Sequence, residues 1–354
     1  MTLAEDIAIV AFAQTPSYRS YPDTEPSLIM GLVNQILEET KLDRHQIDFT
    51  IAGSSDYLSG SPFSFIANVD GFGAWPPVYE SHVEMDGAWA LFEAFVRLQM
   101  GDIDIALVAG SGKSSPGTPR EIFPLQTDPY VHAPLGLDPV SVAALQACAL
   151  IHAGKATERD FAEVVSRSRR DGLSNPYAQV AKDVSVETLL KEPYYASPLR
   201  EHDLPPISDG ASVMLIARAK RARELCEKPV WIRGVDHRFE SHHLGLRDLT
   251  DSPSSRIAAR HLGLDAGSLD MAELCVRYSP EEMVLRGALE LGENTKINPS
   301  GGPLCGHPVM ATGLTRVIEL ARRIRGGEAG RGLAHATSGP ALQQNLLCIL
   351  EGDS

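Results

Sequence analysis

The loop at residues 298–308, with the sequence NPSGGPLCGHP, places one histidine, His307, among glycines and prolines. Glycine lets the backbone turn sharply or approach a ligand closely, while proline fixes its own backbone angle. An imidazole held in so restricted a loop can move a proton at a defined place beside a ligand. The alternative is a tight turn with a solvent-facing histidine, because most clusters of glycine and proline are turns. We predict that His307 is a catalytic residue.

A second candidate for chemistry lies in the segment VEMDGAWAL, residues 83–91, where strand-like sequence enters an apolar helix. Glu84 and Asp86 stand at the start of that helix, where free backbone amides and the helix dipole stabilise negative charge. We interpret Asp86 as a simple helix cap. Glu84 remains a candidate catalytic residue.

Three other motifs have a structural interpretation. The sequence AGSGKSS (109–115) ends like a phosphate-binding loop, but Leu107 stands where that motif requires glycine. The sequence VDHRFESHH (235–243) has histidines and acidic residues without a spacing typical of zinc sites. The sequence ARAKRARELCEK (217–228) is typical of a solvated basic helix. We therefore expect no bound metal.

The composition argues against several classes of protein. The 354 residues include 46 acidic and 32 basic ones, and a formal net charge of −14 disfavours binding to nucleic acid. Five scattered cysteines without a CxxC pair indicate a reducing compartment rather than a disulfide framework. The first residues lack the positive charge of a secretory signal, and no apolar run approaches the roughly 20 residues that span a bilayer. We expect a cytoplasmic protein without a membrane span.

The chain alternates buried, β-rich runs with segments of helical periodicity, and this order occurs twice with a break near 218–229. Such alternation predicts βαβ units, parallel sheets covered by helices, and a duplicated α/β architecture. The predicted strands are 7–13, 49–55, 105–111, 211–217, 230–235, 271–278, 332–337 and 345–350. The predicted helices are 27–41, 87–101, 141–153, 158–170, 254–264, 281–292 and 312–325.

Several segments together resemble the thiolase superfamily, in its lipid-transfer or sterol-carrier-protein-X branch, over nearly the whole chain. They are ALVAGSGKSS (106–115), NPYAQ (175–179), SPLREHDLPPISDGAS (197–212) and INPSGGPLCGHPVMATG (297–313). The resemblance implies two similar α/β halves, residues 1–225 and 226–354, in a five-layer α-β-α-β-α fold. It also implies a dimer and a coenzyme A thioester as substrate or ligand, with no further cofactor. The residues that it suggests for substrate binding are Ser300, Gly301, Gly302, Gly306 and Gly339.

The sequence departs from the thiolase pattern at three of four polar catalytic positions. Glu84 stands where the resemblance implies the acyl-carrying cysteine, and Thr337 where it implies the second cysteine. Cys275, in the segment CVRY, replaces the histidine or asparagine that positions a water molecule. His307 alone is retained. Because a carboxylate cannot replace a thiolate in thioester exchange, we do not expect conventional acetyl-CoA acyltransferase activity.

Three functions remain open in an acyl-CoA context, with breakdown of lipids or steroid side chains as the setting. The first is a subunit of a heteromeric complex that cleaves a C–C bond, paired with another thiolase-like chain or with an acyl-CoA-binding protein of OB-fold and zinc-ribbon type. The second is a retro-aldolase for β-hydroxyacyl-CoA thioesters, with Glu84 or Tyr278 as base and His307 as a hydrogen-bond donor. The third is binding of acyl-CoA without chemistry.

Overall fold

Ten strands form one continuous sheet in the computed structural model, which describes residues 3–60, 62–73 and 79–353. The strands follow one another across the sheet in the order β10-β9-β11-β12-β8-β1-β7-β4-β2-β3, and β5 pairs with β6 in a separate ribbon. The strands are β1 (Ile7–Gln14), β2 (Phe49–Gly53), β3 (Glu80–Val83), β4 (Ile105–Lys113), β5 (Tyr194–Ala196), β6 (Leu199–Arg200), β7 (Asp209–Arg218), β8 (Val230–Phe239), β9 (Met271–Glu273), β10 (Lys296–Ile297), β11 (Arg331–Ser338) and β12 (Gln344–Glu351).

The large sheet consists of two halves that meet where β1 pairs with β8. That pairing covers only Ile7 to Ile9, opposite Ile232 to Val230. Strands β1, β2, β3, β4 and β7 precede residue 225, while β8 to β12 follow it. The predicted boundary between residues 225 and 226 therefore lies between the strands of one half and those of the other.

Each half mixes parallel and antiparallel pairing, so the prediction of parallel sheets was wrong in part. In the first half β2 pairs in parallel with β3 and β4, but β7 is antiparallel to β1 and β4. In the second half β9 is parallel to β10 and β11, but β12 is antiparallel to β8 and β11. The short 339–343 connection between β11 and β12 explains one such pair, because a parallel neighbour requires a long crossover.

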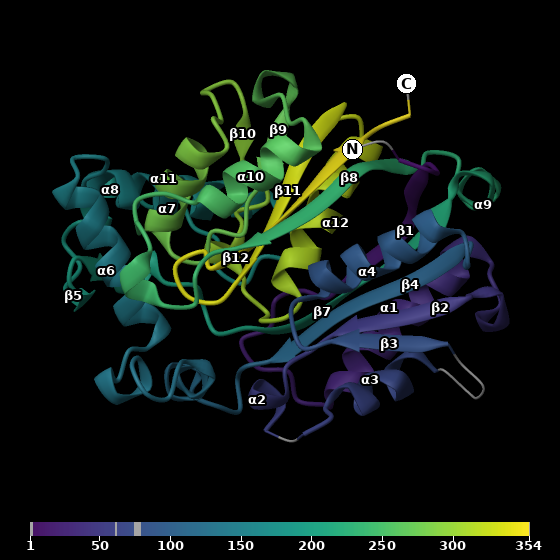
Figure 1. Cartoon of the computed structure of the whole chain (residues 1–354), viewed down its shortest axis with the longest axis horizontal. Helices are drawn as coiled ribbons and strands as arrows, with labels where there is room; N and C mark the ends of the chain where they lie inside the picture. Colours follow the sequence, from purple (N-terminus) through teal and green to yellow (C-terminus); the bar gives the residue numbers. More distant parts are fainter. Residues whose placement is uncertain (1–2, 61, 74–78, 354) are drawn as a thin grey trace.

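Helices divide the buried apolar side chains into three cores. Helices α4 and α12 lie in the central core between the two half-sheets, as Figure 1 shows. Helices α1, α3 and α9 cover the outer face of the first half, and α6, α7, α10 and α11 cover that of the second. The predicted five-layer α-β-α-β-α arrangement is therefore confirmed. The helices that form these layers are α1 (Glu25–Thr40), α3 (Phe65–Phe72), α4 (Gly87–Met100), α6 (Pro139–His152), α7 (Glu158–Asp171), α9 (Ala219–Leu225), α10 (Pro253–Leu262), α11 (Ser279–Ala288) and α12 (Thr312–Arg325).

The remaining short helices are α2 (Asp56–Ser59), α5 (Pro119–Ile122) and α8 (Val186–Leu189). Within the described ranges, no helix combines the length and the apolar character that crossing a membrane requires.

One predicted strand is much shorter than its sequence pattern indicates. We expected a strand over 271–278, but β9 ends at Glu273. The Leu274 amide donates to the side-chain oxygen of Asn298 at 2.6 Å, while the Cys275 amide still donates to the carbonyl of His335 on β11 at 3.1 Å. Residues 276–278 then lead directly into α11.

Backbone contacts bring the start of α4 against β4 and against the turn before α12. The amide of Gly87 donates to the carbonyl oxygen of Met310 at 2.8 Å. A Cβ atom on Gly110 would lie 2.5 Å from that same oxygen, which is closer than Cβ atoms come to any neighbour. Glycine is therefore required at this crossing, because only a residue without a side chain permits so close an approach.

Asp86 caps two helices, whereas we predicted that it caps one. Its carboxylate accepts hydrogen bonds from the amide of Ala88 at 2.9 Å in α4, and from Gly313 at 2.8 Å and Leu314 at 3.0 Å in α12. The side chain is buried at the meeting point of the two helix N-termini, where negative charge is favoured. Asp86 therefore joins an element of the first half to an element of the second.

Replacing Asp86 should weaken the whole fold rather than one helix end. Asp86→Ala leaves three buried amides without an acceptor, so we expect the free energy of unfolding to fall by about 3 kcal/mol or more. Chemical denaturation measures this change. Thr157→Ala, which removes the exposed cap of α7, is the matched control with an expected loss of about 1 kcal/mol. Equal losses in the two variants would contradict the bridging role of Asp86.

Candidate functional site

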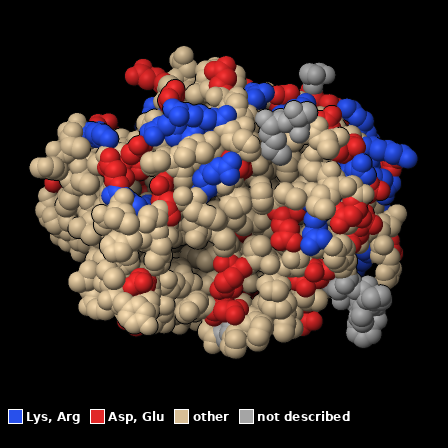
Figure 2. Space-filling view, viewed as in Figure 1, with Lys and Arg blue, Asp and Glu red and all other residues tan. Residues whose placement is uncertain are grey.

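A cavity of about 440 Å³ opens beside the N-termini of α4 and α12. Its volume lies in the range of about 300–1,000 Å³ that is usual for small-molecule sites. Figure 2 shows a hollow in this face of the molecule, bordered by acidic side chains. The described residues that line the cavity come from the start of α4, the 123–142 region, and segments near 242–244, 275–278, 307–312 and 337–344. Five of the residues singled out from the sequence, namely Glu84, Cys275, Tyr278, His307 and Thr337, thus lie in one place.

Glu84 lies at the exposed rim of the cavity, immediately before α4. Its carboxylate accepts a hydrogen bond from the backbone amide of Asp56 at 2.7 Å. Partial burial raises the pKa of Glu84, and the nearby Asp56 carboxylate raises it further. Glu84 can therefore take up a proton more readily than an isolated carboxylate and can exchange it with solvent.

His307 lies deeper in the cavity wall and remains neutral. Burial, with the charges of Arg277 and Arg316, lowers its pKa from 6.5 to about 3. Its Nδ1 atom lies 2.8 Å from the hydroxyl oxygen of Thr312, and that hydroxyl donates to the carbonyl of Pro308. Because the hydroxyl proton is engaged there, Nδ1 carries the ring proton and Nε2 is left as an acceptor. We expected a donor at this position, and the hydrogen bonds indicate an acceptor.

The segment that follows β9 contributes three side chains of different character. Burial raises the pKa of the Cys275 thiol to about 12, so this group stays protonated at neutral pH. Burial also raises the pKa of the Tyr278 hydroxyl, which makes it a donor rather than the base that we considered. Arg277, which sequence reasoning missed, lies between them and also lines the cavity. No motif identifies it, because its position depends on the early end of β9.

The end of β11 and the loop that follows it also line the cavity. Thr337 lines the cavity, but its hydroxyl donates to the carbonyl of Gln344 at 2.9 Å. Its proton is therefore not free to replace that of the cysteine that the family resemblance implies. Gly339, which we predicted to contact substrate, also lines the cavity and has a positive φ of 70°. Its carbonyl accepts a hydrogen bond from Arg277 at 2.9 Å.

The other residues proposed for substrate binding lie behind His307, outside the lining of this cavity. Ser300, Gly302 and Gly306 line a second cavity of only about 20 Å³. A Cβ on Gly301 would lie 2.8 Å from the sulfur of Cys305, so this glycine packs against protein. Contact of these four residues with substrate stays a prediction.

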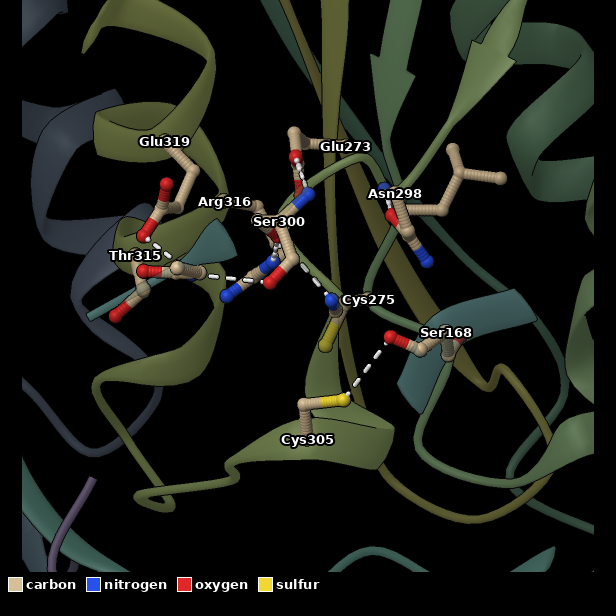
Figure 3. Close-up of polar contacts among 12 residues, drawn as sticks. Ser168, Glu273, Cys275, Asn298, Ser300, Cys305, Thr315, Arg316 and Glu319 are labelled. Carbon is tan, nitrogen blue, oxygen red and sulfur yellow. Dashed lines mark hydrogen bonds and ion pairs between the residues drawn. The ribbon is translucent and has the colours of Figure 1, made fainter. Parts of the chain in front are cut away.

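A buried ion pair holds the loop that carries His307 (Figure 3). The hydroxyl of Ser300 donates to Glu273 at 2.7 Å and accepts from Arg316 at 2.6 Å, while Arg316 and Glu273 lie 2.7 Å apart. Glu273 and Arg316 are both buried, and each needs the other as a partner because removing an unpaired charge from water is costly. This network joins β9, the loop and α12, and so sets where the imidazole lies.

The acidic and histidine residues of 235–243 separate in the structure. Asp236 forms an ion pair with Arg238 at 3.0 Å, and its carboxylate lies 3.2 Å from Nδ1 of His261. His237 packs edge-on against Phe92, whereas His242 lies near His132 at the cavity. Throughout the part of the chain that the structure describes, no group of three or more metal-binding side chains comes together.

No protein-family model matches the chain. It is 26% identical over 358 residues to an acetyl-CoA acetyltransferase of Methanothermobacter thermautotrophicus, with 92% of each chain covered. It is 28% identical over 298 residues to sterol carrier protein 2 of Oryctolagus cuniculus, covering 73% of this chain and 54% of that protein. A shorter match of 26% identity covers 54% of this chain and 57% of the 17-hydroxy-3-oxo-4-pregnene-20-carboxyl-CoA lyase of Mycobacterium tuberculosis.

Two solved structures share the fold over essentially the whole chain. The Ltp2-ChsH2(DUF35) aldolase has a TM-score of 0.83 at 18% identity, covering 100% of this chain and 99% of that one. Human mitochondrial 3-ketoacyl-CoA thiolase has a TM-score of 0.81 at 17% identity, with both chains covered completely. The chain therefore has the thiolase fold, and its resemblance to the lipid-transfer, thiolase-like branch is confirmed.

Protonation of His307 should destabilise the folded protein. Between pH 6.5 and about 3 the unfolded chain holds a proton on this ring that the folded chain excludes, so stability falls as the pH decreases. Moving from pH 7.5 to pH 5 should cost about 2 kcal/mol through this residue. His307→Gln should reduce the pH-dependent loss of unfolding free energy by that amount in urea titrations. His152→Gln, at the exposed end of α6, should keep the full loss. A wild-type pH response in His307→Gln would contradict the assignment.

Cys275 should resist alkylation, because the thiolate is the reactive form and burial keeps this thiol protonated. With iodoacetamide at pH 7.5 we expect Cys148, which is exposed, to be modified at least about 100-fold faster than Cys275. Peptide mass spectrometry over time measures both rates, with Cys148 as the internal control. Similar rates at the two positions would indicate an activated thiol in the cavity.

Proposed function

We propose that this protein binds an acyl-CoA thioester and cleaves a C–C bond of a β-hydroxyacyl group by retro-aldol chemistry, as a subunit of a heteromeric complex. The observation that carries the proposal is the composition of the cavity. A carboxylate with a raised pKa, a neutral imidazole and a protonated phenol line it, from Glu84, His307 and Tyr278. The carboxylate suits proton transfer and the other two groups suit hydrogen bonding, and none of the three provides a thiolate.

The cavity is poorly suited to thiolysis. Cys275 is the one cysteine among its described lining residues, and burial raises the pKa of that thiol to about 12. Helix amides at the start of α4 would favour a thiolate, but the charge of Asp86 at that position raises the pKa of the thiol further. Those amides are turned instead toward the Asp86 carboxylate. A conventional acetyltransferase activity is therefore disfavoured, although one relative bears that name.

A retro-aldol cleavage needs a base for the β-hydroxyl and donors for the oxygen atoms that gain charge. The Glu84 carboxylate takes the single β-hydroxyl proton, and the neutral imidazole of His307 packs beside the substrate without accepting that proton. The C–C bond then breaks and a ketone or aldehyde is released. The electron pair of the broken bond stays on the thioester fragment, which becomes an enolate. Tyr278 donates to the oxygen of the departing carbonyl. The enolate carbon finally takes the proton back from Glu84, which yields acyl-CoA and restores the carboxylate.

The comparisons support the reaction class and the assembly. One relative is a 17-hydroxy-3-oxo-4-pregnene-20-carboxyl-CoA lyase, and one structural neighbour is an aldolase composed of Ltp2 and ChsH2(DUF35). By this likeness we propose a steroid or lipid side chain as the acyl group, and a second acyl-CoA-binding protein as the partner. Breakdown of such side chains in the cytoplasm is the corresponding setting.

The purified protein should release a ketone or aldehyde from a β-hydroxy, β-branched acyl-CoA, and chromatography of both fragments measures the rate. Glu84→Gln should lower kcat/KM about 10²–10⁴-fold because it removes the base, and His307→Ala about 10-fold or more. Glu187→Gln, an exposed carboxylate on α8 away from the cavity, is the matched control and should keep the wild-type rate.

The same assay tests the partner. A rate that rises when proteins copurified from the native source are added supports the heteromer. Full activity of the isolated chain contradicts it. Failure of cleavage with and without the copurified fraction contradicts the proposed function.

A further inference from the structure

Among the described residues that line the cavity, Arg277 carries the one permanent positive charge. The lining also contains the carboxylates of Glu84, Asp86 and Asp138. Asp138 is already paired with Arg120 at 2.6 Å, and Asp86 with three helix amides. The neighbouring carboxylates Asp86 and Asp138 thus have other partners, so the position of Arg277 in this lining calls for an explanation.

One side of the Arg277 guanidinium is fixed to protein. Its Nη2 atom donates to Glu281 at 2.8 Å and to the carbonyl of Gly339 at 2.9 Å. The second oxygen of Glu281, which is fully buried, accepts the backbone amide of Arg277 at 2.8 Å and that of Tyr278 at 3.2 Å. The guanidinium is thus held against the start of α11 with little freedom to move.

The other side of the guanidinium retains hydrogen-bonding capacity. No described residue accepts a hydrogen bond from Nη1, whereas Nε is buried out of reach of the cavity. The side chain is 14% exposed, and the exposure is toward the cavity that it lines. A ligand oxygen that enters the cavity can therefore accept a hydrogen bond from Nη1 of a cation whose orientation is already set.

We propose that Arg277 binds the thioester oxygen of the substrate and stabilises the enolate that forms when the C–C bond breaks. The inference rests on the proposed retro-aldol function. In the ground state this oxygen is a neutral carbonyl, and after bond cleavage it carries the electron pair of the broken bond. The hydrogen bonds from Arg277 therefore strengthen as the reaction proceeds, which is the condition for catalysis. The amides of Ala88, Gly313 and Leu314 cannot serve this role, because they donate to the Asp86 carboxylate.

Exchange of α-hydrogen atoms for deuterium isolates this step from C–C cleavage. In D₂O, Glu84 removes an α-proton from acetyl-CoA or propionyl-CoA, the enolate forms, and it takes back a deuteron. Mass spectrometry of the recovered thioester measures the rate, and calorimetry with the same thioester measures binding. The wild type should exchange faster than a blank without protein, because it stabilises the enolate.

Arg277→Gln should slow exchange about 10²–10³-fold, as expected for the loss of one oxyanion donor, while the Kd for the thioester changes less than about threefold. Arg277→Lys keeps the positive charge but loses the planar guanidinium with its several N–H donors. Its exchange rate should lie between those of the wild type and Arg277→Gln. Arg247→Gln is the matched control, because Arg247 donates to Pro340 and Ala341 of the same loop but does not line the cavity. It should exchange like the wild type.

Wild-type exchange in Arg277→Gln and Arg277→Lys, or an equal loss in Arg247→Gln, would overturn the proposal, since the loop rather than the cation would then matter. The absence of exchange in the wild type would overturn it as well. The two proposals fail separately. Exchange that depends on Arg277 without cleavage of any β-hydroxyacyl-CoA supports this inference and contradicts the proposed function. Cleavage of a β-hydroxyacyl-CoA, together with exchange that does not depend on Arg277, supports the proposed function and contradicts this inference.

Discussion

A single buried carboxylate holds together the two helices on which the cavity is built. Asp86 accepts amide hydrogen bonds from α4 and from α12, which belong to the two halves of the chain. The N-terminus of a helix is where proteins commonly stabilise a thiolate or a bound anion. In this protein the anion at both N-termini is the Asp86 carboxylate, which accepts amide hydrogen bonds from each helix. The cavity must therefore obtain positive charge from a side chain, and Arg277 is the side chain that supplies it.

The protonation states of the cavity follow from burial. Desolvation keeps His307 neutral and keeps the Cys275 thiol and the Tyr278 hydroxyl protonated. Glu84 differs because it lies at the rim, where water can still reach a carboxylate whose pKa is raised. The result is one group that can exchange protons with solvent, surrounded by groups that donate or accept hydrogen bonds without changing charge. Such an arrangement favours carbon acid chemistry over acyl transfer.

The fold limits the chemistry less than the cavity does. Chains with this fold include a 3-ketoacyl-CoA thiolase and an aldolase, at similar TM-scores of 0.81 and 0.83. The five layers position the same few chain segments around one cavity, and substitutions within those segments change what the cavity can do. In this chain the buried pair of Glu273 and Arg316 holds the His307 loop through contacts that do not depend on the reaction.

The layers and most helices could be predicted from the sequence, because periodicity reports which faces are buried. The run IAIVAFA and the helix GAWALFEAFVRLQM carry that information locally. His307, Glu84, Cys275 and Thr337 could be named from motif positions, but their meeting in one cavity required the fold. Antiparallel β7, the double cap at Asp86 and the cavity position of Arg277 were decided by tertiary structure alone. Each depends on hydrogen bonds between segments far apart in the chain, such as those from Leu274 to Asn298 and from Gly313 to Asp86, and no local pattern of residue types encodes such partners.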